Sequence, residues 1–349
     1  MKRFRMFAIL VSVIAFFSLN YGQTSAHGGQ NNGTTVGDYT ITPIYTDELP
    51  TALLKCFESH RGGGPVDVHI KNNSHKTVAF TVSVSIQDYT SSPGTETKSI
   101  GAGDTGTLSP IFFIDPEKLA TLSSLTQSTY QVAISTSNGE RDNSVYKDSH
   151  LVQLMAADVL PWKYRGYDMT GFAALWVTPT APAIEEFLAT AKKYAFKKEF
   201  VGYAWGKDNV RRQVEAIFKA LKKRGMSYVN GEISFPVGSQ RIRLPEDALR
   251  EESANCIDGS VLMASALEAI DLEPLLVIIP HHCFLGWKIM PGSKDCEFLE
   301  TTMIGTNSFE QACAYGYQEY TNCAKYIRTG SVKLIDTKML HNGGFVPFR

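Results

Sequence analysis

Residues 253–289 read SANCIDGSVLMASALEAIDLEPLLVIIPHHCFLGWKI, and residues 296–302 follow shortly after with CEFLETT. The first half of the longer stretch is almost continuously apolar between Cys256 and Ile270, which is typical of a buried helix. This helix must end before Pro274, because proline cannot continue it. The sequence therefore predicts a helix that begins at Cys256.

Strands follow this helix. Residues 275–279 are wholly apolar, and a second apolar run begins at His282. The turn-forming residues 291–295 then reverse the chain, so 297–302 should pair antiparallel with the second run. A helix packed on an antiparallel sheet makes this region α+β.

A cysteine at the start of a helix is suited to nucleophilic chemistry. The unpaired N–H groups of the first turn and the positive end of the helix dipole stabilise a thiolate. The same N–H groups can hold the oxyanion of a tetrahedral intermediate. Asn255, Gln240 and the backbone N–H of Cys256 are the candidate donors. The alternative interpretation is a packing cysteine, since cysteine is among the most buried residue types.

A histidine and a carboxylate accompany the cysteine. An antiparallel hairpin that turns at 291–295 brings His282 close to Glu300, where side chains on one face lie within contact. An imidazole can take the thiol proton and later protonate a leaving amine, and a carboxylate can orient the ring. The sequence thus predicts the triad Cys256, His282 and Glu300. A shift in strand register by one residue would place Glu300 on the other face.

His281 leaves a second interpretation open. Because neighbouring strand residues point to opposite faces, only one of His281 and His282 can face Cys256. Together with Cys283 and Cys296, these residues could instead be a metal site. Their spacing matches no zinc motif, so we expect neither a metal nor a cofactor.

The same residues resemble the transglutaminase-like superfamily, whose core is papain-like. The nearest resemblance is to the transglutaminase-like segment of certain bacterial helicase-type proteins, with the approximate motifs GQ-x-[VI]-R-x-P, TCLD, LEAIGL-x-P, GHAF-x-G and D-T-T. This chain has SQRIRLPEDAL at 239–249, NCIDGSVLMASALEAIDLEP at 255–274, HHCFLGW at 281–287 and ETT at 300–302. The likeness covers most of residues 160–340.

The resemblance implies a role for each matching residue. Cys256 falls on the family's nucleophile, His282 on its histidine and Glu300 on its aspartate, while Asp258 supports the helix start. Three departures stand out: glutamate replaces aspartate, HHC replaces GHA, and Asp271 occupies a glycine position. No helicase part is present.

The preceding region has a different periodicity. Residues 66–70 and 78–86 alternate between apolar and polar, with turn residues at 72–75, which predicts a β-hairpin with one buried face. Frequent short strands over 38–157 predict a β-sandwich of roughly immunoglobulin type. Residues 158–349 then form the transglutaminase-like domain. The pattern also predicts a helix capped by Thr180 with Pro182 in its first turn, a helix from Asp208 to Gly225, a short helix or turn at 245–252, a capping box at Ser308 and Gln311, and a closing strand at 332–335.

The N-terminal residues have the pattern of a secretory signal peptide. Basic residues precede an apolar run over 6–19, and small residues end at Ala26, so residues 1–26 are expected to be a cleaved signal peptide and 27–37 a flexible tether. An uncleaved anchor is the alternative. We expect a secreted, periplasmic or cell-envelope protein with no other membrane span. We assign no disulfide to its six cysteines.

These observations predict an exported thiol enzyme that acts on amide bonds of a peptide, protein or cell-wall-derived substrate. Hydrolysis is favoured over transamidation, because water is the default acceptor. The net charge of −1 gives no reason to expect nucleic-acid binding. The alternative from another class is a non-catalytic binding protein that keeps the fold.

Overall fold

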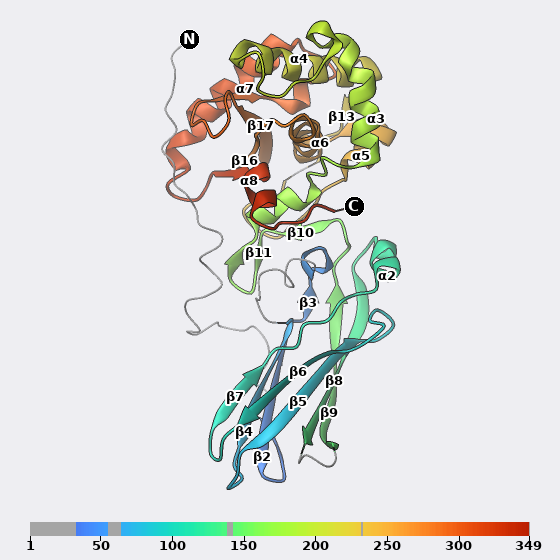
Figure 1. Cartoon of the computed structure of the whole chain (residues 1–349), viewed down its shortest axis with the longest axis vertical. Coiled ribbons are helices and arrows are strands. Elements are labelled where there is room, and N and C mark those ends of the chain that lie inside the picture. Colours follow the sequence, from blue (N-terminus) through green and yellow to red (C-terminus); the bar gives the residue numbers. More distant parts are fainter. Residues whose placement is uncertain (1–32, 55–63, 138–141, 232, 349) are drawn as a thin grey trace. The chain divides into compact units, whose positions relative to one another are not determined.

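The computed structural model describes residues 33–54, 64–137, 142–231 and 233–348. Two compact units divide the chain between Val159 and Leu160 (Figure 1). The molecule mixes α and β structure, with several antiparallel sheets. The expected signal peptide, most of the tether and Cys56 lie outside the described residues. Among the described segments, no helix combines the length and the apolar character needed to cross a bilayer.

The N-terminal unit contains two sheets. One has the strand order β1-β2-β4-β7, and the other has the order β3-β9-β8-β5-β6. The elements are β1 (Thr34–Val36), β2 (Tyr39–Tyr45), β3 (Glu48–Leu49), η2 (Thr51–Leu53), β4 (Val66–Asn72), β5 (Val78–Ile86), β6 (Gly94–Ile100), β7 (Thr105–Leu108), α2 (Pro116–Thr121), β8 (Thr126–Ser137) and β9 (Asp142–Leu154). Alternate residues of both sheets, such as Val68 of β4 and Val82 of β5, are fully buried in one shared core.

The predicted hairpin between β4 and β5 is wrong. β4 pairs with β2 and β7, whereas β5 pairs with β6 and β8 in the other sheet. Apolar and polar residues alternate in the same way in two strands that pair and in two strands that face each other across a core. The periodicity of the sequence therefore could not distinguish a hairpin from strands in separate sheets. The chain passes from one sheet to the other after β4, and the buried Asn72 side chain forms hydrogen bonds there. Its amide donates to the carbonyls of Lys76, Ile100 and Gly101.

The C-terminal unit is built around the antiparallel sheet β18-β17-β16-β19. Its elements are β10 (Val159–Pro161), β11 (Lys163–Tyr164), β12 (Tyr167–Asp168), η3 (Thr170–Trp176), α3 (Pro182–Ala191), η4 (Lys192–Tyr194), η5 (Phe196–Lys198), α4 (Lys207–Arg224), β13 (Ser227–Tyr228), β14 (Ser239–Arg241), α5 (Pro245–Glu251), β15 (Ser253–Ala254), α6 (Cys256–Ala269), β16 (Pro274–Ile279), β17 (His282–Lys288), β18 (Cys296–Leu299), η6 (Thr301–Met303), α7 (Phe309–Cys323), η7 (Ala324–Tyr326), β19 (Lys333–Asp336) and α8 (Thr337–Asn342).

Most helix boundaries agree with the sequence pattern. α4 ends at Gly225, whose φ of 96° is the left-handed geometry of a C-cap, and α7 begins with the predicted capping box of Ser308 and Gln311. The Thr180 cap is wrong: Ala181 precedes α3, with Pro182 as its first residue and no side-chain cap. Proline needs no partner for its nitrogen, so the helix can start without a capping side chain.

Helices α6 and α7 contact opposite faces of the sheet. The Cys283 thiol of β17 lies within hydrogen-bonding reach of Ser260 on α6. The adjacent Phe284 packs edge-on against Phe298 of β18, which stacks on Tyr320 of α7. Because neighbouring strand residues point to opposite faces, the sheet lies between the two helices.

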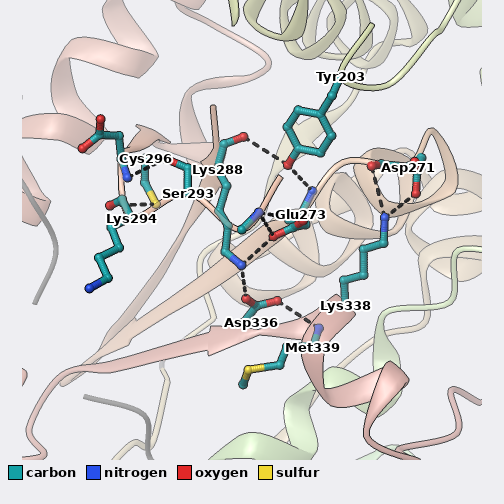
Figure 2. Close-up of polar contacts among 12 residues, drawn as sticks. Tyr203, Asp271, Glu273, Lys288, Ser293, Lys294, Cys296, Asp336, Lys338 and Met339 are labelled. Carbon is teal, nitrogen blue, oxygen red and sulfur yellow. Dashed lines mark hydrogen bonds and ion pairs between the residues drawn. The ribbon is translucent and has the colours of Figure 1, made fainter. Parts of the chain in front are cut away.

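An ion cluster holds the C-terminal end of β17. The Lys288 ammonium lies 2.6 Å from Glu273 and 2.6 Å from Asp336, and all three side chains are largely buried (Figure 2). The Tyr203 hydroxyl accepts from the backbone N–H of Glu273 at 2.9 Å. Nearby, Asp271 pairs with Lys338 and adopts a φ of 67° just after α6. This left-handed geometry explains why a glycine would suit that position, and aspartate tolerates it better than most residues.

Candidate active site

Helix α6 presents Cys256 as its first residue. Asn255 is the N-cap, and its Oδ1 accepts from the N–H of Asp258 at 2.9 Å, while the Asp258 carboxylate accepts from the N–H of Asn255. This is a capping box, which satisfies two of the four N–H groups of the first turn. The Cys256 side chain itself is buried, with 2% of the residue exposed.

The motif residues before α6 brace this helix start. The other oxygen of Asp258 accepts from the backbone N–H of Arg243 at 2.9 Å. Burial raises the pKa of Asp258, and its hydrogen bonds from the Arg243 and Asn255 backbones oppose that rise. Asp258 therefore supports the helix start, as the resemblance implied, and lies in a largely buried position.

His282 begins β17 and lies between a thiol and a carboxylate. Its Nε2 is 2.7 Å from Oε2 of Glu300, and the ring is near enough to the Cys256 thiol for that thiol to affect the pKa of His282. Because Nε2 contacts Glu300, Nδ1 is the ring nitrogen without that carboxylate contact. Burial lowers the pKa of His282, but the contacts with Cys256, Glu300 and Glu319 outweigh it and raise the pKa well above the ordinary value.

Glu300 lies just beyond the end of its strand. β18 ends at Leu299, so the predicted strand over 297–302 is too long, and Glu300 instead caps the short helix η6. Its Oε1 accepts from the N–H of Thr302 at 2.8 Å, and its Oε2 faces His282. Burial raises the pKa of Glu300, but the hydrogen bond from His282 outweighs this and holds the pKa below its usual range.

The register explains how these side chains meet. β17 and β18 pair Leu285 with Leu299 and Gly286 with Phe298, and the same offset places position 300 opposite Phe284. His282 is two residues from Phe284 and therefore on the same face as Glu300. The sequence thus predicted this juxtaposition correctly to within a diagonal position.

Hydroxyl groups connect Thr301, the neighbour of Glu300, to the helix that begins at Cys256. Thr301 Oγ1 donates to the Cys256 carbonyl at 3.2 Å, and Ser260 Oγ donates to the same carbonyl at 2.7 Å. The Thr301 hydroxyl also approaches Gly259, where a Cβ would lie 3.3 Å from it. The loop that carries the acid is therefore fixed directly against the helix that carries the thiol.

Glu319 is a site residue that the sequence analysis missed. It projects from α7, and its Oε2 lies 3.4 Å from Nε2 of His282. Burial raises the pKa of Glu319, and the nearby Glu300 adds to this, whereas His282 opposes it. The available signal was weak: Glu319 precedes Tyr320 on the helix flank that faces the sheet, an unusual place for an acid.

Gly316 lets α7 approach closely enough for this contact. A Cβ at Gly316 would lie 2.7 Å from the backbone nitrogen of Leu299 and 2.9 Å from that of Glu300. The N–H of Glu300 also donates to the Ala312 carbonyl of α7 at 3.0 Å. The helix therefore rests on the backbone beside the acid, which brings Glu319 to the histidine.

The remaining predicted residues lie apart from this cluster. Gln240 uses its Oε1 to accept from the N–H of Ser234 and its Nε2 to donate to the Arg241 carbonyl. His281 is exposed in the two-residue turn between β16 and β17, with a φ of 65°. The five cysteines of the described chain, Cys256, Cys283, Cys296, Cys313 and Cys323, are all free.

One hollow borders the site. A cavity of about 440 Å³ is lined by Pro280 and Val332 together with Glu319 and Cys323 of α7. Tyr228 is half exposed and lies close enough to Cys256, His282 and Glu300 for their charges to affect it. Burial, followed by the charge of Cys256, raises the pKa of the Tyr228 hydroxyl.

Comparisons with known proteins leave the family open. No family model and no curated protein matches this chain. Among solved structures, a FixG-related protein from Vibrio parahaemolyticus matches 34% of this chain and 98% of its own, at 14% identity and a TM-score of 0.24. A protein from Archaeoglobus fulgidus matches 35% of this chain and 90% of its own, at 9% identity and a TM-score of 0.19. The exo-chitosanase of Amycolatopsis orientalis matches 68% of this chain, which spans 31% of the enzyme, at 10% identity and a TM-score of 0.23.

Proposed function

We propose that this chain is an exported thiol enzyme that cleaves or transfers amide bonds, with a transglutaminase-like unit that follows an immunoglobulin-like sandwich. The observation that carries the proposal is the position of the His282 imidazole, between the thiol of Cys256 and the carboxylate of Glu300. Two sheets around one core support the sandwich, and the motifs from 239 to 302 support the family.

In the proposed first step, His282 takes the thiol proton and the Cys256 sulfur attacks the carbonyl carbon of the amide. The unpaired N–H groups at the start of α6 are positioned to stabilise the resulting oxyanion. The imidazolium then gives its proton to the departing amine, the C–N bond breaks, and a thioester to Cys256 remains.

In the second step, His282 takes a proton from water or from an acceptor amine, which attacks the thioester carbon. The C–S bond breaks, and the sulfur regains a proton from the imidazolium. Water gives hydrolysis and an amine gives transamidation. Glu300 keeps the ring oriented and stabilises its cationic form throughout. The substrate class that fits this chemistry is a peptide, protein or wall-derived amide.

The first experiment is the alkylation rate of Cys256 by iodoacetamide, followed by mass spectrometry of the full chain between pH 5 and pH 9. We expect rapid alkylation that persists at pH 6, because the imidazolium stabilises a thiolate. His282→Ala should slow the reaction at pH 6 by about 100-fold, and Glu300→Gln by about tenfold. The half-buried Cys296 thiol of the same molecule is the internal reference.

A Cys256 that reacts no faster than Cys296 and is indifferent to both substitutions would remove the enzyme proposal. The chain would then be a non-catalytic binding protein on the same fold. A fast Cys256 that depends on His282 would justify a screen of amide substrates.

A further inference from the structure

Nε2 of His282 carries one hydrogen but faces two carboxylates. Oε2 of Glu300 lies at 2.7 Å and Oε2 of Glu319 at 3.4 Å. The ring and the two acids come from β17, the start of η6 and α7, so distant parts of the chain converge on one atom. A single N–H makes one strong hydrogen bond, so only one of the two carboxylates can accept it and the other is surplus to the proposed triad.

Glu319 Oε2 is that surplus group. The atom itself is buried although 21% of the Glu319 side chain is exposed, and at 3.4 Å its approach to Nε2 of His282 is an ion pair whose geometry, among the described residues, falls short of a hydrogen bond. Glu300 is also enclosed, with 2% of its side chain exposed. A buried carboxylate oxygen without a hydrogen bond costs about 1–3 kcal/mol or more, which is a reason to expect an additional ligand there.

We propose that His282, Glu300 and Glu319 form a zinc site. Their three ligand atoms all lie within 4.8 Å of one another. Tetrahedral zinc with bonds of about 2.0–2.1 Å holds neighbouring ligand atoms roughly 3.4 Å apart, so the three atoms need to move by only about 1 Å. Imidazole nitrogen and carboxylate oxygen are both zinc ligands, and a water molecule completes the tetrahedron.

Charge is compatible with zinc at this place. A neutral imidazole with two carboxylates and Zn²⁺ carries no net charge, which suits a largely buried place. Calcium and magnesium do not fit, because both require six or more ligands that are mostly oxygen.

Zinc at this place switches the thiol chemistry off, a consequence that rests on the proposed function. Once Nε2 donates its lone pair to zinc, the ring proton resides on Nδ1. That nitrogen then has no lone pair with which to take the thiol proton. The zinc ion therefore prevents His282 from acting as a base without binding Cys256. Glu319 supplies the third ligand that makes zinc binding possible.

The test is zinc uptake by the purified full chain, measured by equilibrium dialysis with zinc chloride at pH 7.5. We expect one equivalent per chain at micromolar zinc, and an affinity reduced by about 100-fold in Glu319→Gln. Glu310→Gln, an exposed acid on the same helix, is the matched control and should keep full affinity. Excess calcium or magnesium should not displace the zinc.

Cys256→Ala separates this site from an ion held by the thiol, and should retain its zinc. Absence of uptake by the wild-type chain overturns the proposal, and so does loss of zinc in Cys256→Ala with retention in Glu319→Gln. Glu319→Asp keeps a carboxylate, and partial recovery of affinity shows that a lower value in Glu319→Gln is not misfolding.

Zinc should also slow alkylation of Cys256 in the wild type and not in Glu319→Gln. Binding is measured with the metal alone, so the two proposals can fail separately. A fast, His282-dependent thiol without zinc uptake removes only the zinc site. Zinc uptake by a chain whose thiol ignores His282 removes only the enzyme.

Discussion

Strand β17 places His282 at its first residue and Lys288 at its last, and each lies between two carboxylates. Both side chains project from the same face of the strand, because they are six positions apart with a period of two. The Lys288 cluster is complete: the ammonium has three hydrogens for Glu273 and Asp336, which also accept from the N–H groups of Gly292 and Met339.

The His282 cluster is not complete in this sense, since one N–H faces two acids. Burial lowers the pKa of Lys288, but its hydrogen bonds with Asp336 and Glu273 outweigh this and raise it, so the ammonium stays charged. The contacts of His282 likewise raise its pKa, whereas burial raises the pKa of Glu319 and so favours the neutral form of that acid. The Lys288 cluster, in which every carboxylate has a hydrogen-bond donor, therefore stabilises the sheet. The His282 cluster has one carboxylate more than its N–H can bind, which is the feature that we propose zinc uses.

The largest expected effect is at the lysine end. Lys288→Ala leaves two largely buried carboxylates without their cation, so we expect the free energy of unfolding to fall by about 3 kcal/mol in urea titrations at pH 7. Lys294→Ala removes an exposed lysine from the adjacent turn and should change it by about 0.5 kcal/mol or less. Equal effects of the two substitutions would show that the Lys288 cluster adds nothing to stability.

At the histidine end, removal of the surplus acid should have the opposite sign. The pKa of Glu319 is raised in the folded protein, so its ionisation destabilises the fold as the pH rises above the ordinary value of about 4.3. Glu319→Gln should therefore raise the free energy of unfolding by about 1 kcal/mol at pH 8, and by less at pH 5. Urea titrations beside Glu310→Gln provide the measurement. A larger gain at pH 5 than at pH 8 would contradict the assigned direction.

A second histidine sharpens the comparison, because each of its ring nitrogens has one acceptor. His341 Nδ1 lies 2.5 Å from Glu268 and Nε2 lies 2.9 Å from the Ala174 carbonyl. Burial lowers the pKa of His341, but the hydrogen bond with Glu268 outweighs this and raises it. The imidazolium therefore contributes stability that is fully present below about pH 6.5 and is lost as the pH rises through the folded pKa.

We expect His341→Gln to cost about 1 kcal/mol more at pH 6 than at pH 9, measured by urea unfolding. His75→Gln, which replaces an exposed histidine of the N-terminal unit, should show no such dependence. A constant cost across this range would mean that His341 is neutral in the folded protein.

The parts of the candidate site that depend on neighbouring residues could be predicted from the sequence. The helix start at Cys256, its capping residues and the strand that begins at His282 follow from apolar runs and turn residues, and the pairing offset then brings Glu300 near. Glu319 could not be found in this way. It reaches His282 only because Gly316 allows α7 to lie on the backbone of residues 299–300, and no short-range pattern encodes that approach.

The N-terminal unit shows the complementary failure. Alternation correctly marked the strands of β4 and β5 but could not assign them to sheets, since pairing partners are chosen over long sequence distances. The family resemblance has the same limit, because its motifs cover residues of the site and say nothing of Glu319 or of the partners of β4.

The pairing order of the N-terminal unit also sets a sequence of events for its assembly. β5 pairs with β8, and the short β3 pairs in parallel with the end of β9, with Glu48 beside Gln153 and Leu49 beside Leu154. The short β3 therefore cannot pair until β9, the last strand of this unit, has been synthesised. Such non-local topology folds in milliseconds to seconds, far more slowly than a helical bundle. Deletion of β9 should therefore leave both β3 and β8 with an unpaired edge in this unit.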